Sequence, residues 1–399
     1  MPRIGPWFAA SATLFLCRAM LFSTWLSQGP QVQSALGLST AQMGWFVMLF
    51  PLGGLLGISY ASTLTERLGS MRLGMLGFGL SALCLAGLGL MVPAGQVLPS
   101  ALLLLLMGLP MAVMDYLGNY EGTRVDKASA HSLLPAIHSA FGLGMMAAAQ
   151  LSSELISREL GLAFNFWLVA AFAGPVAMVA SLVFSRMESA GTSPATMAGG
   201  EMRAWREGRT LLVALIGFSF IMAEISAGIW APIALAQSGS TQAAAASALG
   251  LLWVLVTLGR AMGGFIVDRF GRTATMVGST LLTAAGVAVF MLDGWLHLSH
   301  AGLVLWGSGL AMGFPLAVAC MGDDPARAPA RINLIISVVY LASMVVGPAL
   351  GSLGQMVGIH LAFSIPLAFM LLSSLLSARL GKAQPAATPT GHHPIPAEP

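Results

Sequence analysis

Two charged side chains interrupt apolar stretches that are otherwise long enough to cross a membrane. Arg18 lies in the middle of the stretch 7–27, and Glu224 lies in the middle of the stretch 210–236. Ionisable groups are costly in the hydrocarbon core, so where they occur they mark a functional site by default. Arginine suits a polar or anionic group, and glutamate can take up and release a proton. We therefore expect Arg18 and Glu224 to face one cavity, each as the nearest partner of the other. A purely structural role for Arg18 is the alternative.

Asp115 and Asn119 form a second polar pair, one helical turn apart near the end of the stretch 98–119. Residues four apart share one face of a helix. The two side chains can therefore act together on a proton or a solute. The alternative is that they cap the end of this helix and meet Arg124 or Lys127.

Three further side chains are candidate site residues because of their positions in the predicted spans. His138, near the start of the fifth stretch, titrates near neutrality and could relay a proton, or it could simply pack between helices. Trp25 and Trp230 follow Arg18 and Glu224 by seven and six residues. Their matched placement suggests walls or a gate of a binding cavity, whereas tryptophans at membrane interfaces commonly form a belt facing lipid.

Charge is also concentrated in two short turns. The first charged turn consists of Glu66, Arg67, Gly69 and Arg72, and the second of Asp268, Arg269, Gly271 and Arg272. Their acidic residues are 202 positions apart, and such repetition is the mark of a duplicated transporter. Pairing of these charges with a neighbouring helix and its dipole would form a conformational latch. We assign Arg260, two turns before Asp268, to the same latch. The alternative is that the basic residues only set the topology.

Composition excludes a water-soluble protein, because 57% of the residues are hydrophobic and only 8% are charged, against about 25% in soluble domains. The basic residues are few and scattered over short loops, which excludes nucleic acid as a partner. The three cysteines are far apart within apolar stretches, so we expect neither a disulfide nor a metal site, and no cofactor.

The apolar stretches predict twelve membrane-spanning helices, since about 20 apolar residues cross the hydrocarbon core. They lie at 7–27, 41–63, 72–92, 98–119, 132–153, 162–184, 210–236, 243–266, 274–292, 298–321, 330–352 and 358–379. We expect an N-terminal bundle at 1–184, a cytoplasmic linker at 185–209, a C-terminal bundle at 210–382 and a disordered tail at 383–399. With both termini in the cytoplasm, 15 lysines and arginines lie inside and only Arg158 outside.

The charged turns carry a resemblance to a known family. The segment "GGFIVDRFGR" resembles the G-x-x-x-D-R-x-G-R-R signature of the major facilitator superfamily, and "SYASTLTERLGSMR" resembles it less strictly, with Glu66 for Asp and Ser70 for a basic residue. The segments "MDYLGNYEGTRVDKASAHSLLPAIHSAFGLG" and "EISAGIW" are similar to a bacterial fucose-permease-like branch. The resemblance implies an all-α membrane protein of two pseudo-symmetric six-helix bundles, with helices one, four, seven and ten around the cavity.

The resemblance also implies a secondary transporter of the bacterial inner membrane that moves a small polar solute by alternating access. We expect proton coupling, a lipid environment and a monomer. No G-x-x-x-x-G-K-[ST] loop occurs, which argues against transport driven by ATP. An efflux antiporter is the alternative, although the fifth span lacks the glycine and proline pattern typical of antiporters. A membrane enzyme would need a polar motif such as H-E-x-x-H, and a sensor would need an output domain; neither is present.

Overall fold

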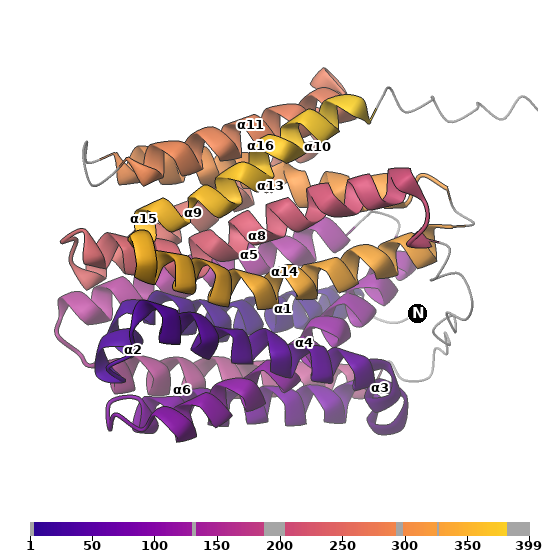
Figure 1. Cartoon of the computed structure of the whole chain (residues 1–399). Coiled ribbons are helices and arrows are strands. Elements are labelled where there is room, and N and C mark those ends of the chain that lie inside the picture. Colours follow the sequence, from indigo (N-terminus) through magenta and orange to yellow (C-terminus); the bar gives the residue numbers. More distant parts are fainter. Residues whose placement is uncertain (1–3, 130–132, 187–203, 293–297, 325–326, 381–399) are drawn as a thin grey trace, which may run out of the picture.

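The computed structural model describes residues 4–129, 133–186, 204–292, 298–324 and 327–380. Within them the chain is built of helices that run alongside one another (Figure 1). The first half contains α1 (Ile4–Ser27), α2 (Gly29–Ala35), α3 (Thr40–Met91), α4 (Val97–Ala128), α5 (Leu134–Ser157), α6 (Leu162–Ser181) and the 3-10 turn η1 (Leu182–Arg186). The second half contains α8 (Gly208–Gln237), α9 (Gln242–Ala261), α10 (Gly263–Phe270), α11 (Arg272–Met291), α13 (Ser299–Met321), α14 (Ala328–Val357), α15 (Ile359–Ala362) and α16 (Ser364–Arg379).

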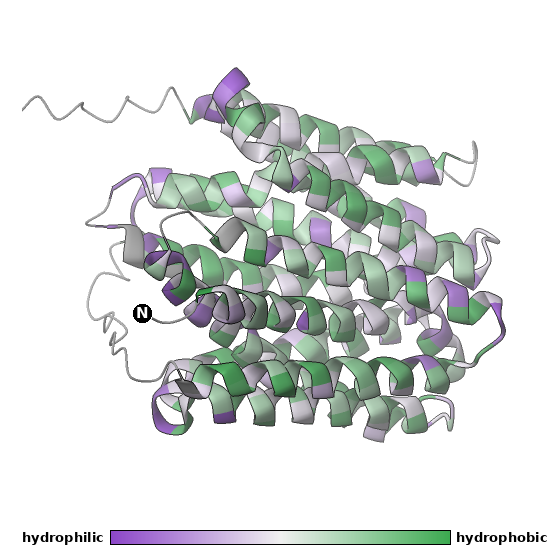
Figure 2. Ribbon diagram, turned by 180° about the vertical axis from the view of Figure 1, so that it is seen from behind, coloured by the Kyte–Doolittle hydropathy of each residue, from purple (hydrophilic) through white to green (hydrophobic). Residues whose placement is uncertain are grey.

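These helices account for the twelve predicted spans. In the described chain, 10 helical segments are long and apolar enough to cross a membrane. One of them, α3, has 52 residues and contains Gly69 in a non-helical conformation, so it provides two spans. The twelfth span is α5, which packs along α1 and α9. Apolar residues cover the sides of the molecule while polar residues gather at the two ends (Figure 2), as the lipid core requires.

The internal repeat predicted from the charged turns is present in the backbone. Gly69 has φ 74° and ψ 159°, and Gly271 has φ 79° and ψ 160°. A side chain is disfavoured at such positive φ, which explains glycine at both positions. Each glycine breaks the chain between two antiparallel spans. The two halves therefore repeat in conformation as well as in sequence.

One predicted boundary is wrong. The fourth span was expected to end at residue 119, with a charged loop beyond it, but α4 continues to Ala128. Glu121 is consequently helical and fully buried, and Arg124 shields it at 2.9 Å. Charges can extend a helix in this way when the helix passes the membrane edge and the charges find partners. Most of the predicted linker and all of the tail from 383 lie outside the described residues.

The two halves meet mainly along two pairs of helices, α3 with α14 and α5 with α9, and α2 also contacts α8. We call the end of the bundle at which α1 begins the amino-terminal face, and the end that carries α2 the opposite face (Figure 1). Within the described chain, the hydrogen bonds that join the halves all lie toward the opposite face. They connect Thr40 with Gln355 at 3.0 Å, Ser153 with Ala243 at 2.8 Å, and Gln150 with Ser247 at 3.2 and 3.4 Å.

Glycine makes the closest of these contacts possible. A Cβ at Gly44 of α3 would overlap the carbonyl oxygen of Gly347 of α14, and one at Gly347 would overlap that of Gly44. Small residues allow helix backbones to approach in this manner. The molecule is thus closed at the opposite face.

Replacing Gly44 should open that closed face. In Gly44→Leu the side chain cannot fit against Gly347, so α3 and α14 must separate. We expect a cysteine placed at Val47, which is buried beside Gly347, to react several-fold faster with a water-soluble maleimide in this variant than in the parent. Gly278→Leu is the matched control, because nothing lies within 4 Å of a Cβ at Gly278. Equal labelling in both variants would show that this contact does not hold the face closed.

Candidate functional site

Arg18 lies on α1 and is held by three groups of its own half. Its Nη1 is 3.0 Å from Oδ1 of Asp115 on α4, and its Nε donates a 3.2 Å hydrogen bond to the carbonyl of Met111. Its guanidinium carbon lies 5.2 Å from the centre of the Phe141 ring on α5. The expectation that Glu224 is the partner of Arg18 is therefore wrong. Asp115 fills that role because α4 packs directly against α1.

Glu224 has a partner in the second half. Its Oε2 lies 3.2 Å from Nη2 of Arg260, which stands in the last turn of α9 beside α8. Arg260 was assigned to the latch from sequence, and the structure places it with the membrane-embedded charges instead. Its long side chain spans the distance between two neighbouring helices. Each half thus neutralises its own membrane-embedded charge.

The two ion pairs approach each other where α5 crosses α9. A Cβ at Gly142 of α5 would overlap the Thr257 hydroxyl of α9, so the helices touch there. His138, one turn before Gly142, is exposed, and its ring centre lies 4.7 Å from that of Phe15. Its imidazole lies within range of electrostatic interaction with the charges of Asp115, Arg260 and Arg18.

Tyr340 of α14 completes this site, because the charges of Asp115 and Arg18 also act on its phenol. We name the set the central polar cluster: Arg18, Asp115, His138, Glu224, Arg260 and Tyr340. Its members come from six helices of both halves. The charged side chains are 20% exposed at Arg18, 37% at Asp115, 34% at Arg260 and 18% at Glu224, so water can reach them.

The remaining residues predicted for the cavity lie differently. The amide of Asn119 donates to the backbone carbonyl of Asp115 at 2.8 Å, within its own helix. Trp25 is 3% exposed and Trp230 is fully buried, with no hydrogen-bond partner for its indole nitrogen among the described residues. Burial excludes the lipid-facing belt for both tryptophans.

The charged turns are mostly unpaired in this conformation. In the part of the chain that the structure describes, Glu66, Arg67, Arg72, Asp268 and Arg269 are exposed and form no hydrogen bond or ion pair. Arg272 is the exception, at 2.7 Å from Asp323. Among the described residues, no hydrogen bond or ion pair joins the two halves at this end.

Glu121 is an important residue that the sequence reasoning missed. It is fully buried and accepts hydrogen bonds from the indole of Trp7 at 2.9 Å and from the Ser70 hydroxyl, in addition to its ion pair with Arg124. It therefore ties α1 and the start of the third span to the end of α4.

The second half contains the same arrangement. Asp323 binds Arg209 at 2.8 Å and Arg272 at 2.7 Å. The offset of 202 that relates the charged turns also relates Trp7, Ser70 and Glu121 to Arg209, Arg272 and Asp323. Extending that offset along the sequence would have identified both acidic residues. We call these two groups the acidic hubs.

Glu207, just before α8, anchors the start of α14 in a similar way. Its carboxylate lies 2.7 Å from Arg331 and 3.1 Å from Arg327, and it accepts a 2.8 Å bond from Thr210. The hydrogen bonds from Thr210 and Arg331 hold the pKa of this carboxyl below its usual range. Glu207 therefore remains a stable anionic anchor at neutral pH.

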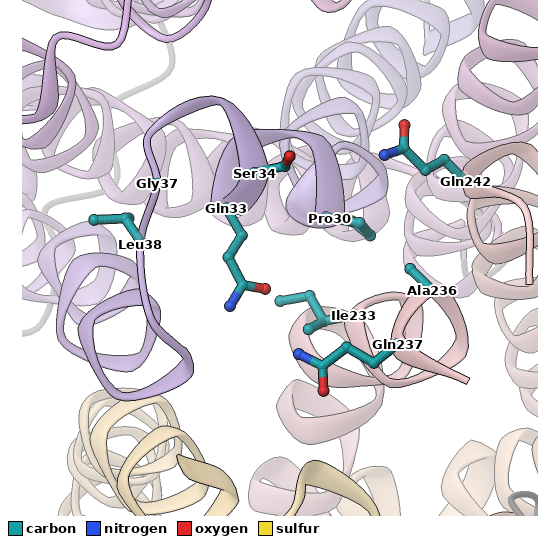
Figure 3. Close-up of a pocket in the computed structure, with 9 residues that line it drawn as sticks. All are labelled: Pro30, Gln33, Ser34, Gly37, Leu38, Ile233, Ala236, Gln237 and Gln242. Carbon is teal, nitrogen blue, oxygen red and sulfur yellow. The ribbon is translucent and has the colours of Figure 1, made fainter. Parts of the chain in front are cut away.

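A hollow of about 360 Å³ opens at the opposite face, between α2 and the end of α8 (Figure 3). Gln33, Ser34 and Gln237 give it polar lining, and Ile233 lies between the two glutamine side chains in the view shown. It contains none of the residues predicted for the site. Among the described residues no group of three or more metal-ligating side chains occurs.

The acidic hub of the first half should contribute strongly to stability. Glu121→Ala removes the buried carboxylate that accepts from Trp7 and Ser70 and pairs with Arg124, which should cost about 3 kcal/mol. The matched control is Glu154→Ala, whose ion pair with Arg158 is more than half exposed and should contribute below about 1 kcal/mol. Unfolding of the purified proteins in detergent measures both. Similar losses in the two variants would contradict the role of the hub.

Comparison with known proteins gives full-length matches. No family model matches the chain. An uncharacterized MFS-type transporter of Yersinia pestis is 23% identical over 372 residues, covering 92% of this chain and 93% of the relative. An uncharacterized transporter of Sinorhizobium fredii, y4wD, is 24% identical over 381 residues, covering 94% and 98%. Both of these relatives are named as transporters.

Solved structures of transporters align over almost the whole chain. The nucleoside transporter NupG aligns with a TM-score of 0.76 at 14% identity, covering 95% of this chain and all of the other. A D-xylose–proton symporter gives 0.73 at 13% identity, covering 94% and 97%. FucP in its outward conformation gives a TM-score of 0.65 at 17% identity, covering 94% of this chain and 99% of the other. It is one of several structural neighbours, so the similarity does not single out a fucose-permease-like branch. With twelve spans in two repeated halves, the chain has the fold of the major facilitator superfamily.

Proposed function

We propose that the protein is a secondary transporter of the bacterial inner membrane that moves a small polar solute by alternating access, coupled to protons. The amino-terminal face is cytoplasmic in this proposal, as the asymmetry of lysine and arginine favours. The solved neighbours include a proton symporter for D-xylose and a transporter for nucleosides, which supports a small polar solute.

The observation that carries the proposal is the distribution of contacts between the halves. Their hydrogen bonds in the described chain lie toward the opposite face, while the ion pairs of the membrane interior stay within each half. The halves can therefore rock about the central polar cluster without breaking an ion pair. With the opposite face closed, the conformation is inward-facing.

Proton coupling is assigned to Glu224, with Asp115 as the second candidate. A carboxylate loses its attraction to arginine when it binds a proton, because the charge disappears. Glu224 is the less exposed of the two, at 18% against 37%, and its ion pair with Arg260 is the longer, at 3.2 Å against 3.0 Å. Protonation of Glu224 therefore releases Arg260.

In the outward-facing conformation, the charged turns act as latches between the two halves. At the amino-terminal face they are exposed and, within the described chain, mostly unpaired. Closing that face would bring Asp268 and Arg269 against the first half, and Glu66 and Arg67 against the second. Their pairing then stabilises the outward-facing state.

Glu224→Gln tests the proton role. Gln resembles the protonated carboxyl, so the variant should lose accumulation driven by a pH gradient while it retains exchange of solute. Uptake and counterflow in reconstituted vesicles measure this, with a solute selected by thermal shift from nucleosides, pentoses, hexoses and hexuronates. Glu154→Gln, at the opposite face, is the control and should behave as the parent. Full pH-driven accumulation by Glu224→Gln would transfer the role to Asp115 or exclude proton coupling.

Asp268→Asn and Arg269→Ala test the latch. Both weaken only the outward-facing state, so transport should fall several-fold while the amount of inserted protein and the binding of solute change little. Accessibility of the central polar cluster from the amino-terminal face should rise. Transport at the parent rate in both variants would show that these charges serve topology alone.

A further inference from the structure

We infer that the transported solute carries a carboxylate or a similar anionic group, and that Arg260 binds it by exchanging Glu224 for the solute. This inference rests on the proposed function, because it names the class of solute for the same central site. It differs from the expectation that Arg18 holds the solute.

Arg18 already has three partners within its own half of the molecule. Its guanidinium contacts the Asp115 carboxylate, the Met111 carbonyl and the face of the Phe141 ring, and it is only 20% exposed. These groups fix it from three directions. Two of its three guanidinium nitrogens, Nε and Nη1, already have partners, so Arg18 offers a solute fewer unengaged donors than Arg260 does.

Arg260 is the better placed cation. Within the described chain its one hydrogen-bond partner is Glu224, through a single nitrogen at 3.2 Å, and its side chain is 34% exposed. A guanidinium has five N–H donors in a planar fork that matches a carboxylate through two parallel bonds. Most of these donors are therefore available to a solute. A bidentate pair with a solute carboxylate can therefore replace the single contact with Glu224.

Charge balance then links the solute to the proton. The cluster holds two cations, Arg18 and Arg260, and two anions, Asp115 and Glu224, beside His138 and Tyr340. An added anion would leave one negative charge uncompensated in a medium where that is costly. Binding of one proton to Glu224 restores the balance: the solute carboxylate pairs with Arg260, and Glu224 becomes a neutral carboxyl.

The stoichiometry follows from this exchange. One proton is bound for each carboxylate, and both leave together, so transport of a monoanion is electroneutral. A neutral solute would leave the Arg260–Glu224 pair intact and would bind no proton by this route. The protein therefore discriminates by charge.

Matched pairs of acids and neutral analogues test the inference on the full-length protein in detergent. The probes are glucuronate with glucose, galacturonate with galactose, lactate with lactamide, and benzoate with benzamide. In at least one pair the acid should bind about ten-fold more tightly than its neutral analogue by calorimetry. Its binding should take up one proton in weakly buffered solution, and binding of the neutral analogue none.

The variants locate the effect at Arg260. Arg260→Gln should remove the preference for the acid, Arg260→Lys should retain part of it, and Glu224→Gln should tighten acid binding and abolish proton uptake. The double variant Arg260→Gln/Glu224→Gln has no stranded charge, so its loss of acid binding cannot be attributed to a poorly folded single variant. Arg158→Gln, at an exposed pair on the opposite face, is the control.

The inference is wrong if no acid binds better than its neutral analogue, if a neutral solute takes up the proton, or if Arg260→Gln leaves acid binding unchanged. Those outcomes leave alternating access and proton coupling intact. Absence of pH-driven uptake in vesicles, with acid binding retained in detergent, would instead overturn the proposed function.

Discussion

The cost of placing a charge in the hydrocarbon core is the constraint on which the structure depends. Arg18, Asp115, Glu224 and Arg260 all lie within helices that cross the membrane, and each has an oppositely charged partner at 3.0 or 3.2 Å. Each pair is formed within a single half, Arg18 with Asp115 in the first and Glu224 with Arg260 in the second. The cost of burial is thus offset within each half, and among the described residues no ion pair joins the halves in the membrane interior.

That interface is made of contacts that can form and break. Gly44 and Gly347 allow α3 and α14 to touch, and Gly142 allows α5 to approach Thr257. The hydrogen bonds across the interface involve neutral groups, such as Ser153 with the carbonyl of Ala243. Neutral hydrogen bonds contribute little net free energy, about 1 kcal/mol each. The closed face can therefore open without a large barrier from charge separation.

In each half, an acidic hub at the amino-terminal face ties helices together. Glu121 joins helices of the first half, and Asp323 does the same in the second. The two are related by the same offset of 202 as the turns at Gly69 and Gly271. Both hubs have an acidic residue at the same place in the repeat, but their partners differ. Glu121 accepts from a tryptophan and a serine where Asp323 binds two arginines. Each half can then move as one body while its charged turn stays free to pair elsewhere.

Much of the fold followed from the sequence by itself. Twelve spans and the division into repeated halves were both predicted, because hydropathy acts locally along the chain. The positive φ of Gly69 and Gly271 was not predicted, although glycine is the residue that such a conformation favours. The membrane-embedded position of Arg18 and Glu224 followed for the same reason.

Only the tertiary structure decided which charges meet. Asp115 rather than Glu224 pairs with Arg18, and Arg260 reaches Glu224 from a neighbouring helix. It also showed that α4 continues past residue 119, which buries Glu121 in a hub. An ion pair depends on which helices are neighbours, on their rotation and on how far a flexible side chain extends. None of these is encoded in the spacing of residues within one span.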